Sequence, residues 1–258
     1  MTGFLRRAGL VLGLPAVLFV VWFVATDSSQ NFYVPPLRRI LVAFADTWTP
    51  ARLRTDVLPS LLRLAAGYLL AVLLGVGIGV VVGAYRRIRA FGEPVLEFFR
   101  AIPPPVLVPV IMLFAGIGNG MKIIVIVSGC IWPVLLNTVE GVRAVDSVLT
   151  DTARSYRLSG TARLRHLVLR SASPQIVTGM RQALSIAIIL MVISEMFAAS
   201  NGLGFTIVQF QRSFAIPEMW SGIILLGLIG FLLSELFRLG ERRVLAWYFG
   251  QRDALRRT

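Results

Sequence analysis

The sequence has 258 residues, of which 56% are hydrophobic and only 15% are charged, and its formal net charge is +13. A soluble domain of this length must cover its core with polar side chains and carries more charge, so a soluble globular protein is excluded. Several apolar runs approach the ~20 residues that a helix needs to cross the hydrocarbon core of a bilayer. The runs are continuous and lack the alternation of a membrane barrel, and they therefore predict an all-α integral membrane protein.

The positive charge does not predict nucleic-acid binding. An excess of arginine in a membrane protein marks the loops that stay in the cytoplasm, and no basic face combines with stacking aromatic side chains outside the apolar runs. The one cysteine, Cys130, lies in an apolar run without a thiol partner, and the one histidine, His166, has no neighbouring metal ligands. The chain also lacks the G-x-x-x-x-G-K-[ST] loop that cradles ATP phosphates. We therefore expect no metal, no cofactor and no catalytic residue, and any ATP must be bound by a partner.

About six segments are expected to span the membrane as one domain, residues 1–258. The first, residues 8–26, follows Arg6-Arg7. A cleaved signal peptide is the alternative, but no small-x-small site follows and further spans come after it. With Arg6-Arg7 inside, most of the 26 Lys and Arg residues fall on the cytoplasmic side, together with both termini. The other spans are expected at residues 61–85, 98–115, 121–139, 176–198 and 219–238.

The segment between the first two spans is amphiphilic and is interrupted at Pro35-Pro36, Pro50 and Pro59. Within it, apolar residues recur at helical spacing and predict a short helix lying on the membrane surface. These residues are Leu37, Ile40, Leu41 and Phe44.

The second span carries glycines on one side of a helix, at a spacing of four residues or its multiple. Such small residues let a neighbouring helix approach closely, which is how helices associate in lipid. The alternative is that glycine is simply frequent in membrane helices. The glycines are Gly67, Gly75, Gly79 and Gly83, of which the last three are our candidate packing positions.

The third span is irregular because Pro103-Pro104-Pro105 and Pro109 interrupt it. Broken backbone at membrane depth is tolerated where it is buried in protein or lines a wet cavity. We therefore expect a bent span here.

An arginine-rich insert, residues 151–174, separates the fourth and fifth spans. Its first part can form two helical turns, Ser159 is placed to cap a second helix, and Pro174 is expected to end that helix. Leu164, Leu167 and Val168 would share one face of it. Two interpretations remain open on the residues alone: the insert binds a soluble partner, or it anchors at anionic lipid.

The insert resembles the cytoplasmic EAA loop of permease subunits of binding-protein-dependent ABC importers, whose pattern is E-A-A-x-x-x-G followed by I-x-L-P. Asp151, Thr152 and Ala153 stand at the E-A-A positions. Leu164 stands at the aromatic position, and Leu167 and Leu169 stand at the isoleucine and leucine positions.

Further motifs are similar to the nitrate, sulfonate and taurine branch of the same family, and together they cover about residues 30–248. They are Phe32-Tyr33-Val34-Pro35-Pro36, Glu93-Pro94, Arg100-Ala101-Ile102-Pro103, Phe114-Ala115-Gly116-Ile117-Gly118, Trp132-Pro133 through Thr138, Gly141-Val142, Ser194-Glu195, and Asn201-Gly202-Leu203-Gly204.

The resemblance implies a type I ABC importer fold and a complex of two permeases, two cytoplasmic ATPases and an extracytoplasmic solute-binding protein. It implies a small anionic organic solute, and a coupling helix in the loop that seats in the ATPase. The candidate coupling residues are Asp151, Ala153, Arg157, Ser159, Gly160, Leu164, Leu167 and Leu169.

Two residues depart from the loop pattern, since Arg157 replaces the turn glycine and Arg170 replaces the proline. Because a non-glycine residue is penalised at positive φ, we expect Ser159-Gly160 to form the turn instead. A shifted turn would change the fit to the ATPase, which favours pairing with a different permease over a homodimer.

Charged residues within spans are costly and usually face a bundle interior or a wet cavity. Glu195 either lines the translocation path or holds the turn at residues 200–204 by a hydrogen bond. Asn137 and Ser194 are further candidates for the path, although most such groups bond to backbone carbonyls. Arg181 is expected at the inner surface, and Glu235 is expected to pair with Arg238 or with Arg242-Arg243.

Two other function classes are less consistent with the sequence. An integral-membrane enzyme needs a convergent set of acids, bases or ligands, whereas Glu195 and Glu235 lie at opposite ends of their spans. A proton-coupled transporter needs a titratable relay at mid-membrane depth, and the sequence offers none.

Overall fold

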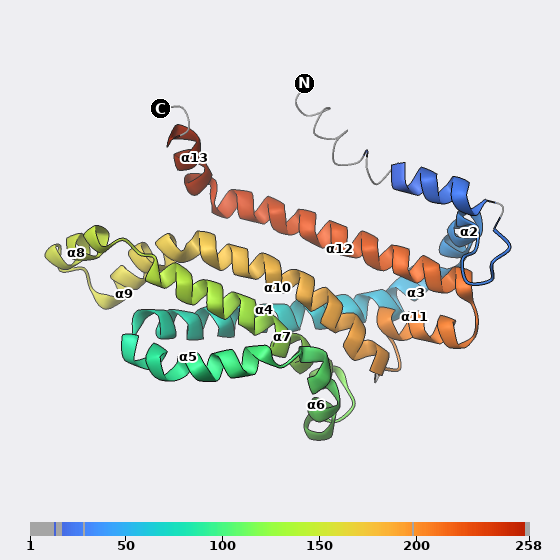
Figure 1. Ribbon diagram of the computed structural model, residues 1–258, viewed down its shortest axis with the longest axis horizontal. Coiled ribbons are helices and arrows are strands. Elements are labelled where there is room, and N and C mark those ends of the chain that lie inside the picture. The colour runs from blue at the N-terminus through green and yellow to red at the C-terminus, as the bar shows by residue number, and fades with distance from the viewer. Residues whose placement is uncertain (1–12, 14–16, 28, 198, 256–258) are drawn as a thin grey trace.

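The computed structural model describes residues 13, 17–27, 29–197 and 199–255. Every regular element in this part of the chain is helical, and the long helices lie roughly along the longest axis of the molecule (Figure 1). The all-α prediction is therefore confirmed.

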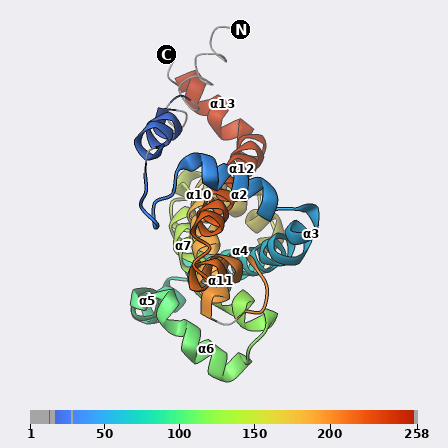
Figure 2. The same ribbon diagram turned by 90° about the vertical axis from the view of Figure 1, so that its right-hand side faces the viewer.

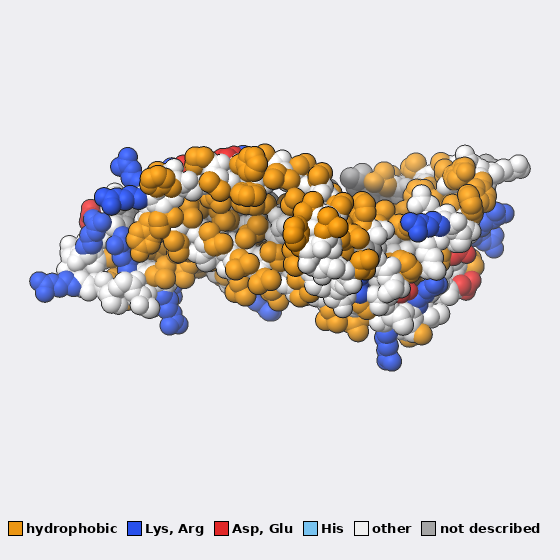
Figure 3. Space-filling view, turned by 90° about the horizontal axis from the view of Figure 1, so that it is seen from below, with side chains coloured by type: hydrophobic (Ala, Val, Ile, Leu, Met, Phe, Trp, Pro, Cys, Tyr) orange, Lys and Arg blue, Asp and Glu red, His pale blue; other side chains and the backbone are white. Residues whose placement is uncertain are grey.

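Four helical segments are long and apolar enough to cross a bilayer. They cover Pro50–Ala84, Asn119–Arg143, Gly160–Phe197 and Ile216–Val244. A fifth span is the bent pair Arg86–Ala101 and Pro104–Ala115, whose two parts meet at 83°. Of the expected first span, the described part contains the apolar helix Val17–Thr26, and the rest lies outside the described residues. Hydrophobic side chains cover the middle of the molecule in Figure 3, and most Lys and Arg side chains in that view lie toward its two ends.

The core consists of three long helices, α4 (Leu58–Ala84), α7 (Asn119–Arg143) and α10 (Leu169–Phe197). The largest cluster of buried apolar side chains comes mainly from these helices and includes Tyr68, Met121 and Met191. The connection from α4 to α7 runs through α5 (Arg86–Ala101), the 3-10 turn η2 (Pro104–Leu107) and α6 (Val108–Ala115). No residue of α5 is buried, so this helix lies on the outside of the bundle.

The glycines of α4 contact residues of α7 that have the same spacing along the sequence. A methyl group added at Gly67, Gly75, Gly79 or Gly83 would come within 2.9 Å of the Cβ atom of Ile126, Val134, Thr138 or Val142, respectively. The residue numbers of the glycines and of their contacts on α7 increase together, so α4 and α7 run parallel. The backbones can approach this closely because the glycines present no side chain.

The start of the second span was mispredicted. The second span begins at Pro50 and is helical through the π-helical turn η1 (Leu53–Val57) into α4. Pro50 at the first helical position of α3 (Pro50–Arg52) breaks no hydrogen bond, and the Thr49 hydroxyl accepts one from the Arg52 amide. A π-helical turn is wider than an α-helical one, and η1 ends directly before Leu58-Pro59.

Two shorter helices cover one end of the bundle (Figure 2). The expected surface helix is α2 (Leu37–Thr47), which packs on α12 (Ile216–Val244) and buries Leu37 and Ile40, whereas Leu41 is exposed. The sequence did not predict α11 (Leu203–Arg212), which packs on α10 and α12. The last helix in the described part of the chain is α13 (Ala246–Leu255).

Candidate functional site

The arginine-rich insert forms one end of the bundle, where α8 (Ser147–Ser155) is followed by α9 (Gly160–Arg163) (Figure 1). The Asp146 carboxylate caps α8 by accepting hydrogen bonds from the amides of Val148 and Leu149, at 2.6 and 3.4 Å. Cap residues of this kind fix where a helix starts. The helix therefore projects from the end of α7 with a defined first turn.

The outer surface of this end is apolar as well as basic. Val148 and Tyr156 are 70% and 79% exposed, and Leu149, Leu158 and Leu164 are also exposed. Of the E-A-A positions, Ala153 is buried, while Asp151 is exposed and forms an ion pair with Arg154 at 3.0 Å. Exposed apolar side chains beside charged ones are typical of a surface that binds another protein.

The turn after α8 is at Arg157, contrary to our prediction. Arg157 itself has a positive φ of 49°. The Leu158 amide donates to the Ala153 carbonyl at 3.0 Å, and the Arg157 amide donates to the Arg154 carbonyl at 2.9 Å. This pair of bonds is the Schellman motif that ends many helices, usually with glycine at the left-handed position. These hydrogen bonds therefore keep the turn at the position where the family pattern has its glycine. Arg157 occupies that position in a left-handed conformation that is strained for a non-glycine residue.

Ser159 caps the second helix as predicted, but Ser159-Gly160 does not form the turn that follows α8. The Ser159 hydroxyl accepts a hydrogen bond from the Ala162 amide at 3.3 Å and caps α9, and Gly160 is the first residue of that helix. Gly160 is not among the glycines with positive φ. The predicted cap is present, but the predicted shift of the turn is not.

The second helix of the insert does not end at Pro174. It continues from Gly160 through the π-helical turn η3 (Leu164–Val168) to Phe197. Burial of Ala172 and Ile176 on either side of Pro174 holds the helix together despite the missing amide donor. The π-helical turn also separates the expected apolar face: Leu164 is exposed, whereas Leu167, Val168 and Leu169 are half-buried. The insert thus contains two helices joined by a turn, as predicted, but the second of them is an extension of the fifth span and does not end at Pro174.

The opposite end of the core holds a buried ion pair that the sequence analysis missed. The Arg63 guanidinium donates from Nη1 to Glu195 Oε1 at 2.6 Å, and the two residues are 5% and 0% exposed. Arg63 also donates to the side-chain oxygens of Asn119 and Asn201, at 2.8 and 2.6 Å. Arg63 was recognisable as a charge inside an apolar run, but its partner lies 132 positions away.

Glu195 faces the turn rather than a cavity. Its Oε2 accepts a hydrogen bond from the Gly204 amide at 3.0 Å, and the Ser60 hydroxyl lies 2.7 Å from Oε1. The Ser60 hydroxyl also accepts from the Leu203 amide at 2.9 Å. Gly202 has φ of +123°, and a methyl group there would come 2.5 Å from the Glu195 carboxyl carbon. The carboxylate therefore ties the turn at residues 202–204 to α4, the second of the two roles considered for it.

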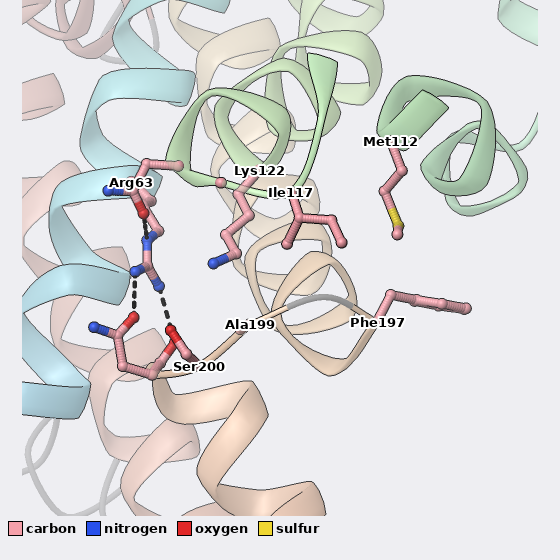
Figure 4. A pocket seen from close by; sticks show the side chains of 10 residues that line it. Arg63, Met112, Ile117, Lys122, Phe197, Ala199 and Ser200 are labelled. Carbon is pink, nitrogen blue, oxygen red and sulfur yellow. Dashed lines mark hydrogen bonds between the residues drawn. The ribbon is translucent and has the colours of Figure 1, made fainter. Parts of the chain in front are cut away.

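A cavity of about 550 Å³ opens beside this ion pair (Figure 4). Lys122, in the first turn of α7, points into it and is 3% exposed. Lys122 is the one lysine of the sequence, and it was not predicted as a site residue. The lining residues are Arg63, Met112, Ile117, Gly118, Asn119, Lys122, Phe197, Ala199, Ser200 and Asn201.

Of the remaining candidate path residues, Asn137 lines a cavity, whereas Ser194 does not. Asn137 lines a second cavity of about 470 Å³ with Arg100, Trp132 and Gln182, and its amide lies 3.3 Å from the Gln182 side-chain oxygen. Ser194 is fully buried, and its hydroxyl donates to the Met191 carbonyl of its own helix at 2.9 Å.

Charged residues of the last two spans are paired. Arg181 forms an ion pair with Glu241, and Glu235 pairs with Arg238 as expected. No group of three or more His, Cys, Asp or Glu side chains that could hold a metal ion occurs within the described ranges.

The α7 helix sets the distance between the two ends of the molecule. It has 25 residues, and a rise of about 1.5 Å per residue makes it roughly 37 Å long. Asn119 and Lys122 at its start line the 550 Å³ cavity, and Arg143 at its end leads into α8. This length exceeds the ~30 Å hydrocarbon core of a bilayer, so the cavity and the insert lie toward opposite membrane surfaces.

Known proteins are similar to this chain in sequence and in fold. The chain matches the family model described as the binding-protein-dependent transport system inner membrane component over residues 71–245, more than half of its length. It is 30% identical over 246 residues to the putative aliphatic sulfonates transport permease protein SsuC of Bacillus subtilis, with 94% of this chain and 89% of the relative covered. It is also 30% identical over 250 residues to the taurine transport system permease protein TauC of Escherichia coli, with 94% and 91% covered.

A more distant relative is the bicarbonate transport system permease protein CmpB of Synechococcus elongatus, 28% identical over 250 residues, with 92% of this chain and 90% of the relative covered. Among solved structures, the MetNI methionine ABC transporter in an inward-facing conformation matches with a TM-score of 0.63 at 19% identity, covering 73% of this chain and 94% of that one. The structural match supports the fold alone. The chain therefore belongs to the family of inner membrane components of binding-protein-dependent transport systems, and the resemblance inferred from its motifs is confirmed.

Proposed function

We propose that this chain is a single-domain permease subunit, residues 1–258, that forms the membrane path of an ATP-driven importer for a small organic anion. The observation that carries the proposal is the arrangement along α7, with a polar cavity at its start and an exposed apolar and basic insert at its end. In this orientation the insert and both termini are cytoplasmic, as the distribution of arginine favours.

The insert, residues 151–174, transmits movement from two cytoplasmic ATPase subunits. The support is that α8 is capped at its start by Asp146, closed at its end by the Arg157 turn, and followed by a helix that continues into the fifth span. A rigid helix seated in a two-state partner passes a rotation on without absorbing it. An extracytoplasmic solute-binding protein would deliver solute at the opposite end.

A second permease subunit completes the path. Our expectation that it differs in sequence from this chain depended on Arg157 and Arg170. Because Arg157 keeps the turn in place, only Arg170, which is exposed on α10, still favours a different partner. Purification of the complex and mass spectrometry of its membrane part test this pairing: a single permease sequence, at two copies per two ATPases, refutes it.

The anionic solute is supported by the relatives and by the charges of the cavity. The relatives are named for aliphatic sulfonates, taurine and bicarbonate, and Lys122 and Arg63 line the 550 Å³ cavity. Asn137, in the second cavity, is our candidate for a polar contact along the path. Glu195 and Ser194 support the path indirectly, since both are buried against their own neighbours.

No observation within the described ranges favours an integral-membrane enzyme or a proton-coupled transporter. The two carboxylates in question already have fixed cationic partners, Glu195 with Arg63 and Glu235 with Arg238.

The coupling role is tested by placing a charge on the exposed apolar surface that α8 and the rest of the insert form together. Leu164→Asp and Val148→Asp alter side chains that are 38% and 70% exposed, so the fold should tolerate both. We expect each variant to lose co-purifying ATPase and ATP-dependent uptake, because a carboxylate in an apolar protein interface is costly to desolvate. Val244→Asp, at a 62% exposed position on the same end, is the matched control. Normal ATPase yield and uptake in both insert variants would contradict the proposal.

A further inference from the structure

Lys122 has no direct ion-pair partner in the described part of the chain, where Glu195 attracts its charge only without contact and Arg63 repels it. Its side chain is almost fully buried, yet its ammonium group forms no hydrogen bond or ion pair with any described residue. Figure 4 shows the ammonium pointing into the space beside Arg63, Ile117 and Ala199. A buried cation without a counter-charge is costly, so such groups are normally paired or neutralised.

The neighbouring carboxylate is already committed to other groups. Glu195 binds Arg63 at 2.6 Å, and its oxygens also contact the Ser60 hydroxyl and the Gly204 amide. The three nitrogens of the Arg63 guanidinium are directed to Asn119, Glu195 and Asn201. Arg63 and Glu195 therefore cancel each other, and the cavity keeps the one positive charge of Lys122.

The start of α7 adds further groups that favour an anion. Gly118 is the N-cap of this 25-residue helix, and no side chain caps it. The Asn119 side-chain oxygen accepts the hydrogen bond of Arg63. Free amides and the positive end of the helix dipole are thus present where Gly118 and Asn119 line the cavity.

The remaining wall of the cavity is apolar. Met112, Ile117 and Phe197 line it, opposite the polar residues Ser200 and Asn201. A volume of about 550 Å³ is within the usual range for small-molecule sites. The cavity therefore matches a molecule that has an anionic head and a short apolar part.

We propose that this cavity binds a small organic anion, with its carboxylate or sulfonate group on Lys122 and its carbon chain against Met112, Ile117 and Phe197. The identification of that anion as the transported solute rests on the proposed function. A phospholipid phosphate has the same oxyanion chemistry, and the experiment below separates the two sources.

The single lysine gives a direct probe of the site. Reductive methylation of the full-length chain with 13C-formaldehyde, in a neutral detergent without lipid, labels Lys122 and the N-terminal amine and keeps the charge of both. The signal that is absent from Lys122→Arg identifies Lys122 in the NMR spectrum. Titration with propanesulfonate and butyrate should shift the Lys122 signal saturably, while propanol should leave it unchanged and the N-terminal signal should not move.

The other outcomes of this titration are equally informative. A Lys122 signal that responds to neither anion, or equally to propanol, overturns the site. A signal that shifts only when anionic phospholipid replaces a zwitterionic one in nanodiscs, and that propanesulfonate does not displace, assigns the cavity to lipid and overturns the proposal for a solute.

A transport measurement with the reconstituted complex tests the same residue in its working state. Lys122→Met should raise the concentration of anion for half-maximal uptake by at least about tenfold, as expected for a lost charge-assisted hydrogen bond. Lys122→Arg should stay within about threefold of the wild type because it keeps the charge. Arg54→Met, which removes a positive charge from an exposed position at the same end of the bundle, is the matched control.

The anion site and the transport function can be refuted separately. Unchanged uptake in Lys122→Met removes the site and leaves the importer intact. Saturable anion binding by the labelled chain, together with an absence of ATP-dependent uptake by the complex, retains the site and contradicts the proposed function.

Discussion

The contact between α4 and α7 makes a sharp prediction at Gly79. In Gly79→Ala the new methyl carbon would lie 2.6 Å from Thr138 Cβ and 2.9 Å from the Leu135 carbonyl oxygen. Non-bonded heavy atoms prefer ~3.5–4.0 Å, so α7 must move away by about 1 Å. Because Gly67, Gly75 and Gly83 contact α7 in the same register, that movement loosens the whole interface.

The matched control is Gly77→Ala, two residues away on the same helix, where an added methyl group meets nothing within 4 Å. Both substitutions gain the same helix propensity, about 0.5–1 kcal/mol. The difference between the two variants therefore isolates the steric cost, which for overpacking is about 1–3 kcal/mol. We expect Gly79→Ala to be the less stable by this amount.

The assay is reversible unfolding in mixed micelles of a mild detergent and dodecyl sulfate, followed by circular dichroism. A double-mutant cycle with Thr138→Gly, which removes the clashing carbon, should show that this second change costs less in the Gly79→Ala background. Equal stability of Gly79→Ala and Gly77→Ala would refute the close approach of α4 and α7.

Three further predictions concern the two ends of the bundle. Arg157→Gly should raise the free energy of unfolding by about 1 kcal/mol, because glycine adopts positive φ without strain; a lower melting temperature than the wild type would contradict the Schellman turn. Ser60→Ala should lower the free energy of unfolding by about 1–3 kcal/mol, because it leaves the buried Leu203 amide without its acceptor. The control Ser213→Ala loses an exposed hydroxyl that bonds to the nearby Gln209 carbonyl, and it should change the melting temperature little. Asp146→Ala should destabilise α8 by about 1 kcal/mol and speed amide hydrogen exchange in residues 147–155, and unchanged exchange there would show that the cap is unimportant.

The sequence predicted well those features of the fold that depend on residues close together in the chain. The apolar runs predicted the long helices, the four-residue glycine spacing identified the face of α4 that meets α7, and Pro103-Pro104-Pro105 predicted the bent span. The turn of the insert was mispredicted because residue propensity favours Gly160 over Arg157 at positive φ. The hydrogen bonds of the helix end at Ala153 and Arg154 override that preference.

The ion pair and the cavity could not be derived from local patterns. Arg63 and Lys122 are visible in the sequence as charges within apolar runs, and a single lysine among 26 basic residues is a signal in itself. Their surroundings come from four separate segments, however, and Arg63 contacts Glu195 across 132 positions. The π-helical turns at Leu53–Val57 and Leu164–Val168 likewise have no signature in the residue pattern.

The packing of α7 explains how the two ends of the molecule can act together. One face of α7 receives the glycines of α4, and another meets α10, where methyl groups at Gly129, Gly141 or Gly179 would come within 3.0 Å of α10 or α7 atoms. Interfaces packed this closely deform little, so α4, α7 and α10 must move as one body. A tilt imposed on α8 at the end of α7 is therefore carried to Lys122 at its start, whereas α5, which buries no side chain, is free to adjust. Coupling between the insert and the cavity thus requires no pathway of local changes, only the rigidity of this three-helix core.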